Sequence, residues 1–88
     1  MKIYYSGKFA REYRKLPLSV KKNAEEKEKI FRKNPLDKRL KVHKLKGGLK
    51  DFWFFSINDN YRIIFEFISK QEIWFHSTGT HGIYKLWD

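Results

Sequence analysis

The sequence has no cysteine, so it offers neither a disulfide framework nor a thiolate metal site. It also has no long apolar run. The longest uninterrupted one, Phe52–Phe55, is far too short to span a membrane. The apolar stretch near Met1 is too short for the hydrophobic region of a signal peptide. These absences favour a cytoplasmic protein without a membrane partner.

Acidic residues are scarce: ten Asp and Glu stand against twenty Lys and Arg, which gives a net charge of +10. Residues 1–33 carry eleven basic and four acidic groups, residues 34–50 carry six and one, and residues 51–88 carry three and five. Solubility or heat adaptation would explain many charges, but not this excess of one sign in half of the chain. The pattern predicts a polyanionic partner, and nucleic acid in particular.

A chain of 88 residues predicts one domain, spanning residues 1–88, with a modest core. Eight Phe, five Tyr and three Trp compensate for the small size, because each buried aromatic ring removes a large area from water.

The first half of the chain predicts a strand and two helices. Lys2–Ser6 is short and rich in β-prone residues, and Gly7 interrupts it. Two apolar stripes then recur at helical spacing: Phe9, Tyr13 and Leu16, followed by Val20, Ala24, Lys27 and Phe31, with the stem of Lys27 along the apolar face. Pro17 separates the two helices and suits the first turn of the second. Asn34-Pro35 ends the second helix, because the residue before proline avoids the α region.

The second half changes to a period of two. Phe52–Ile57, Tyr61–Ile68 and Glu72–Thr78 read as strands, with turns at residues 58–60 and 69–71. Between the halves, residues 36–50 fit either a short strand or a loop. The order β-α-α-β-β-β predicts an α+β fold: a small, mainly antiparallel sheet with a helical hairpin on one face. In the middle strand, Ile63 and Phe65 would point to the helices, and Arg62 and Glu66 away from them.

Three motifs occur in a fixed order. His43–Gly47 reads HKLKG, Tyr61–Phe65 reads YRIIF, and Thr78–Tyr84 reads TGTHGIY. Together they resemble the RelE/ParE toxin superfamily, and its YafQ-like branch most. The resemblance covers essentially the whole chain. It implies the fold described above and, for many members, metal-free cleavage of messenger RNA on the ribosome, which needs no cofactor. It also implies a cognate antitoxin that binds the toxin and silences it.

The resemblance carries over to four candidate catalytic residues. Arg62 matches the arginine that many members place against the scissile phosphate, and His81 matches the C-terminal histidine of the YafQ-like branch. His43 matches a histidine of that branch, and Tyr84 an aromatic residue near the reacting nucleotide. Two positions depart from YafQ itself: Ser56 stands where YafQ has a further active histidine, and Asn60 where it has an aspartate.

These residue types suit the chemistry. Histidine can take the proton of the attacking 2′-hydroxyl or protonate the leaving 5′-oxygen, since its ordinary pKa lies near neutrality. The planar fork of arginine can hold two phosphate oxygens. Each residue also has a plainer interpretation. Arg62 could pair with Glu66, His43 could be a solvated side chain, and Tyr84 could anchor the C-terminal segment. His76 reads as sheet surface or as a satisfied core residue.

A set of basic residues suits contact with RNA phosphates or with the ribosome: Arg39, Lys41, Lys44, Lys46 and Lys50. An antitoxin that folds on binding would be expected to cover such cations together with an apolar groove.

Two other functions fit parts of the sequence. Some members of the superfamily poison DNA gyrase and cut no RNA, although they generally lack the histidines present here. A non-catalytic RNA-binding module would need only the positive charge and exposed aromatic rings. A metal nuclease fits poorly, because three scattered histidines and few clustered carboxylates do not form a ligand set.

Overall fold

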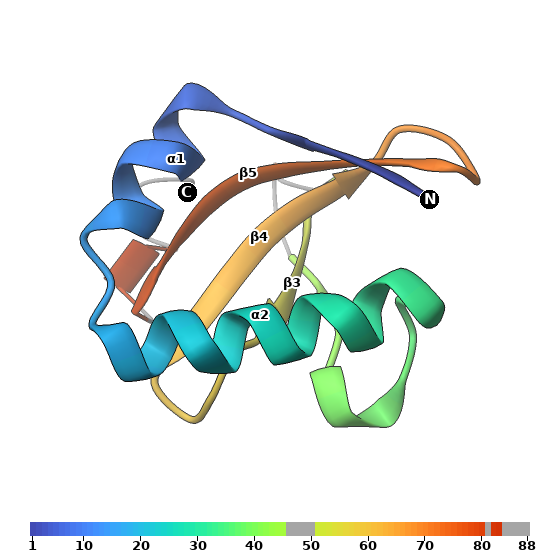
Figure 1. The fold of residues 1–88 in the computed structure, drawn as a ribbon. Coiled ribbons are helices and arrows are strands. Elements are labelled where there is room, and N and C mark those ends of the chain that lie inside the picture. Colours follow the sequence, from blue (N-terminus) through green and yellow to red (C-terminus); the bar gives the residue numbers. More distant parts are fainter. Residues whose placement is uncertain (46–50, 81, 84–88) are drawn as a thin grey trace.

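The computed structural model describes residues 1–45, 51–80, 82 and 83. Its elements follow the predicted order, with one short helix and one short strand added between the two halves (Figure 1). They are β1 (Lys2–Tyr5), α1 (Gly7–Arg14), α2 (Leu18–Lys33), the 3₁₀ helix η1 (Lys38–Leu40), β2 (His43–Lys44), β3 (Trp53–Ser56), β4 (Tyr61–Phe67) and β5 (Glu72–Thr80).

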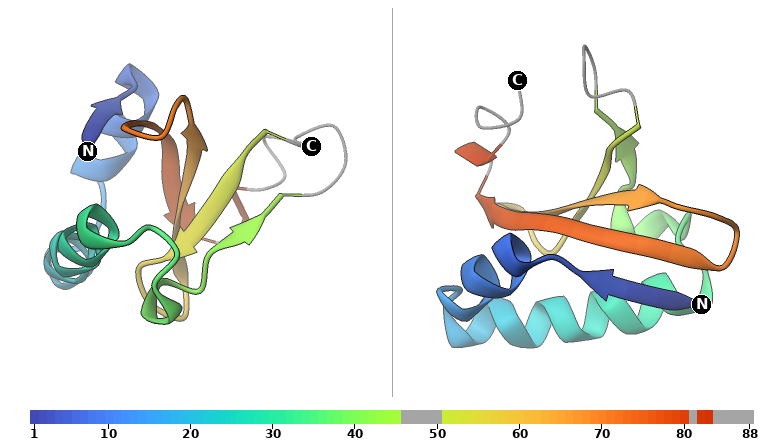
Figure 2. Two further views of the ribbon diagram at one scale, coloured as in Figure 1. Left: turned by 90° about the vertical axis from the view of Figure 1, so that its right-hand side faces the viewer. Right: turned by 90° about the horizontal axis from the view of Figure 1, so that it is seen from above.

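The five strands form one sheet in the order β1-β5-β4-β3-β2. β1 runs parallel to β5, and the other neighbouring pairs are antiparallel. Both α1 and α2 lie on one face of this sheet (Figure 2). The predicted α+β class is therefore confirmed. The stretch that fitted either a strand or a loop contains the short edge strand β2.

Local signals explain where the helices begin and end. The Ser6 hydroxyl accepts a hydrogen bond from the Phe9 amide at 2.9 Å and so caps α1. Pro17 stands immediately before α2, where its missing N–H costs nothing. Asn34 is extended ahead of Pro35 and ends α2, as predicted. The Leu16 side chain belongs to the predicted stripe and is buried, but α1 itself ends at Arg14.

The core lies between the helices and the sheet. Phe31 of α2 packs its ring against three strand phenylalanines, with centroid distances of 5.1 Å to Phe55, 5.0 Å to Phe65 and 5.5 Å to Phe75. All four side chains are fully buried. Ile63 joins the same core, which confirms the face predicted for β4.

A β-bulge interrupts the pairing of β4 with β5. Ile64 is opposite Ser77 and Phe65 is opposite Phe75, so His76 is the extra residue on β5. Bulges of this kind bend a strand and re-aim its side chains. This one lies in the middle of the two longest strands of the sheet.

No helix in the described part of the chain is both long enough and apolar enough to cross a membrane.

Candidate active site

The candidate site lies on the face of the sheet that points away from α1 and α2, called the open face below. Side chains alternate along a strand, so Arg62 and Ile64 point to the open face when Ile63 and Phe65 enter the core. Phe54 is opposite both Ile64 and His43 in the register.

Phe54 brings two of the candidate catalytic residues together. The His43 ring stacks on the Phe54 ring with a centroid distance of 5.3 Å. The guanidinium carbon of Arg62 lies 5.7 Å from the same centroid, within range of a cation–π interaction. His43 and Arg62, which lie 19 positions apart in the sequence, therefore contact the same aromatic ring. The sequence did not single out Phe54.

The turn between β3 and β4 positions the Arg62 guanidinium. Its Nη1 donates to the carbonyl oxygens of Asn58 at 3.0 Å, Asp59 at 3.3 Å and Tyr61 at 3.2 Å. The Asn58 side chain in turn accepts the amides of Asn60 at 2.9 Å and Tyr61 at 3.0 Å, which fixes the turn. Asn58 is thus a positioning residue that the sequence identified only as part of a hairpin.

The two departures from YafQ lie close to Arg62. Ser56 is buried and is directly opposite Arg62 in the register. Asn60 is exposed in the turn that holds the guanidinium. Neither residue has an imidazole or a carboxylate side chain.

Gly79 is also opposite Arg62, on β5. A Cβ atom at this position would lie 2.5 Å from Cγ2 of Ile83, which is itself buried. Only glycine therefore lets Ile83 pack this closely against the open face beside Arg62. This contact explains on steric grounds why the first glycine of the TGTHGIY motif, Gly79, has no side chain.

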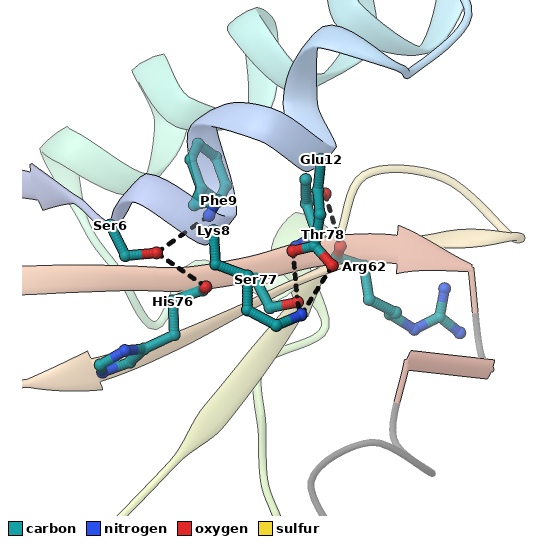
Figure 3. A network of polar contacts seen from close by, with 8 residues as sticks. All are labelled: Ser6, Lys8, Phe9, Glu12, Arg62, His76, Ser77 and Thr78. Carbon is teal, nitrogen blue, oxygen red and sulfur yellow. Dashed lines mark hydrogen bonds and ion pairs between the residues drawn. The ribbon is translucent and has the colours of Figure 1, made fainter.

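Polar contacts join α1 to β5 at the bulge (Figure 3). Glu12 Oε1 accepts from the Ser77 hydroxyl at 2.7 Å and from the Thr78 amide at 3.2 Å. The Thr78 hydroxyl donates to the backbone oxygen of Arg62 at 2.9 Å. Burial raises the pKa of Glu12, but hydrogen bonds from Lys8, Ser77 and the Thr78 amide outweigh it and hold the pKa below its usual value. Sequence periodicity gave no sign of this link.

His76 lies on the open face and pairs with Glu66, at 2.9 Å from Nε2 to Oε1. Its ring lies 4.9 Å from the Phe52 centroid and 4.6 Å from the Trp74 centroid. Of the two interpretations of His76, sheet surface or satisfied core residue, the first fits, because His76 is not part of the buried core. The alternative pairing of Arg62 with Glu66 was wrong, because Glu66 pairs with His76 and Arg62 is held by the turn.

The described members of the predicted basic set differ in their contacts. Arg39 forms a bidentate pair with Asp37, with distances of 3.0 and 2.9 Å, and its hydrogen bonds lower the pKa of Asp37 to about 2. Lys41 is exposed, with a left-handed φ of 52° after η1. Lys44 reaches toward the Trp53 ring at 5.8 Å and so points away from its neighbour His43.

Four predicted site residues lie outside the described part of the chain: His81, Tyr84, Lys46 and Lys50. Within the described part, no group of three or more His, Cys, Asp or Glu side chains is arranged to hold a metal ion.

The fold described above is that of the RelE/ParE toxins. YafQ from Escherichia coli BL21(DE3) superimposes with a TM-score of 0.73 over 94% of this chain and 96% of that one, at 21% identity. A YoeB/ParE toxin from Agrobacterium tumefaciens reaches a TM-score of 0.77 over 92% and 99%, at 16% identity. RelE in the RelE–RelB complex from Pyrococcus horikoshii OT3 reaches 0.72 over 92% and 94%, at 19% identity. No family model and no curated protein matches the sequence.

Proposed function

We propose that this chain is the toxin of a toxin–antitoxin pair and that it cuts messenger RNA on the ribosome. The observation that carries the proposal is that Arg62 and His43 both contact the Phe54 ring. A fixed guanidinium and an imidazole around one ring, on the sheet face away from the helices, suit phosphate binding and proton transfer in one site. The shared fold of YafQ, YoeB and RelE supports the same function.

In the proposed reaction the 2′-hydroxyl of one nucleotide attacks the neighbouring phosphorus. The new bond joins the 2′-oxygen to phosphorus, and the bond from phosphorus to the 5′-oxygen breaks. One histidine takes the 2′-hydroxyl proton, and the other gives a proton to the leaving 5′-oxygen. His43 and His81 fill these two roles, and their order stays open.

Arg62 stabilises the charge that grows on the phosphate oxygens. The turn carbonyls of Asn58, Asp59 and Tyr61 orient its guanidinium before RNA binds, so little ordering is needed at the moment of reaction. Tyr84 would stack on a base or assist one proton transfer, as the resemblance implies. The proposed phosphate contacts of Arg39, Lys41, Lys44, Lys46 and Lys50 add affinity rather than sequence preference.

An antitoxin is the proposed regulatory partner. YafQ has been solved with DinJ, and the Pyrococcus RelE with RelB. The net charge of +10 suits a partner with an acidic segment as well as the ribosome.

The test is primer extension on a defined messenger RNA during translation in vitro, with and without ribosomes. The wild type is expected to give cuts at fixed codon positions only when ribosomes are present. The Arg62→Ala and His81→Gln variants should lose these cuts. Arg14→Ala, which removes an exposed arginine on the helical side, is the matched control and should keep them.

Growth arrest with intact messenger RNA would overturn the nuclease proposal. DNA gyrase would then be the candidate target, since the similar Agrobacterium structure carries the name YoeB/ParE. A supercoiling assay would decide that question.

A further inference from the structure

A row of four rings crosses the open face of the sheet, away from Arg62. Phe52 meets His76 edge-on at 4.9 Å, and His76 lies 4.6 Å from Trp74 at an angle of 32°. Tyr4 of β1 is directly opposite Trp74 in the register and completes the row. The four residues Phe52, His76, Trp74 and Tyr4 are called the ring row below.

The bulge and its contacts put the ring row in place. His76 is the extra residue of β5, its backbone oxygen accepts from the Ser6 hydroxyl at 2.9 Å, and its ring is held by Glu66. The Tyr4 hydroxyl donates to Glu72 at 2.8 Å. His76 within the row and Tyr4 at its outer end are thus oriented by polar contacts.

The outer end of the row is accessible. Trp74 is 40% exposed and Tyr4 is 37% exposed. They line an open groove of about 430 Å³ that has room for a planar base. Exposed aromatic rings on a sheet are costly to keep in water unless something covers them.

Two carboxylates and the ammonium group of Lys2, whose Nζ lies 5.1 Å from the Tyr4 centroid, surround the row. Glu66 is 32% exposed beside His76, and Glu72 lies beside Tyr4. Carboxylates repel the RNA backbone but accept hydrogen bonds from the amino groups of bases. Arg62 on β4 is a further cation of the open face, four residues from Glu66, or about 13 Å along the strand. A short stretch of extended RNA spans that distance.

We propose that the ring row is a stacking platform for the bases of single-stranded RNA that continues from the phosphate at Arg62. Trp74 and Tyr4 stack on one base at the exposed end. Glu66 accepts a hydrogen bond from an exocyclic amino group and so favours cytosine or adenine over uracil. This inference rests on the proposed function, because it assigns the RNA a path beyond the cleaved bond.

Binding of short labelled RNA oligonucleotides with 2′-O-methyl groups tests the platform, since such RNA cannot be cleaved by 2′-hydroxyl attack. Stacking on an aromatic side chain strengthens binding roughly 5- to 150-fold per base. Trp74→Leu keeps apolar area but removes the ring, and it should weaken binding by a factor in this range. Trp74→Phe should restore most of the affinity. Leu36→Ala, at an exposed residue away from the sheet, is the control.

An oligonucleotide with abasic riboses separates bases from phosphates. Wild type and Trp74→Leu should bind it equally, because no base is left to stack. Glu66→Gln should reduce the ratio of the affinity for oligocytidine to the affinity for oligouridine. An amide side chain both donates and accepts hydrogen bonds, whereas a carboxylate only accepts them. Tyr4→Leu, on the edge strand β1, repeats the first test if Trp74→Leu fails to fold, as judged by circular dichroism.

Equal affinity of wild type and Trp74→Leu for the base-bearing RNA would overturn the platform, whatever the cleavage assay gives. A wild type that cuts translated messenger RNA but shows this equality would keep the proposed function and lose the platform. A wild type that cuts no messenger RNA but binds RNA through Trp74 would keep the platform and overturn the proposed function.

Discussion

Arg62 is oriented by its own hairpin. The carbonyl oxygens of Asn58, Asp59 and Tyr61 accept from its Nη1, and the Phe54 ring lies beside the guanidinium carbon. These contacts come from backbone carbonyls and an apolar ring, and they orient the cation. An arginine held in this way can meet a phosphate with little loss of side-chain entropy.

His43 provides a prediction at this scale. The proposal places its imidazole in one of the two proton transfers, so His43→Gln should lower the single-turnover rate of cleavage on programmed ribosomes about 10²- to 10⁴-fold. It should also remove one limb of the pH profile of that rate. Lys44→Gln, the neighbouring change that faces the other side of β2, is expected to affect binding and its salt dependence rather than the pH profile. A His43→Gln rate equal to that of the wild type would return His43 to the role of a stacked surface residue.

Among the elements, α1 and β5 are joined where β5 departs from regular pairing. Glu12 accepts hydrogen bonds from the Thr78 amide and the Ser77 hydroxyl, and the Thr78 hydroxyl donates to the backbone oxygen of Arg62. Helix α1 is therefore bound to the residues that follow the bulge. Through Thr78 it is also linked to β4, which carries the candidate catalytic arginine.

Glu12 makes this link pH-dependent. Its pKa in the folded chain lies below the ordinary value of 4.5, so its stabilisation is complete above that value and is lost as the pH falls through the folded pKa. Glu12→Gln should lower the free energy of unfolding by about 1–2 kcal/mol at neutral pH, since it loses hydrogen bonds to a charged group. Denaturant titrations across pH 3–7 should show a smaller acid-induced loss in the variant than in the wild type, whereas Glu26→Gln, an exposed change on α2, should follow the wild type. If the free energy of unfolding of Glu12→Gln fell with acid as much as that of the wild type, Glu12 would not be the cause of the acid sensitivity.

The elements followed from the sequence because their signals are local. Three of these signals act within a few positions of the chain: the spacing of the apolar residues, Ser6 before α1, and Asn34-Pro35 after α2. The motifs indicated Arg62 and His43 only through resemblance. Phe54, Asn58, Glu12 and the bulge at His76 could not be predicted, because their roles depend on register between strands and on contacts between residues distant in sequence.

On the scale of the whole molecule, the two faces of the sheet differ in kind. One face is covered by α1 and α2 (Figure 2), with four phenylalanine rings in the core between them. The other face carries Arg62, His43 and the ring row. A core of large rings lets a chain of 88 residues build a sheet with its described helices α1 and α2 on one face. The positive charge of residues 1–50 would draw the molecule to the ribosome, and the open face would then meet the messenger RNA.

The most direct test of this account is the single-turnover rate of messenger RNA cleavage on programmed ribosomes for wild type, Arg62→Lys and Arg62→Ala. The account predicts a fall of about 10²- to 10³-fold for Arg62→Ala, as for the loss of one preorganised transition-state donor. Arg62→Lys should give an intermediate rate, since it keeps the charge and loses the fork. Ribosome binding of all three proteins should be similar. A rate for Arg62→Ala that matches the wild type would contradict the account, because the cluster around Phe54 would then not be the site of cleavage.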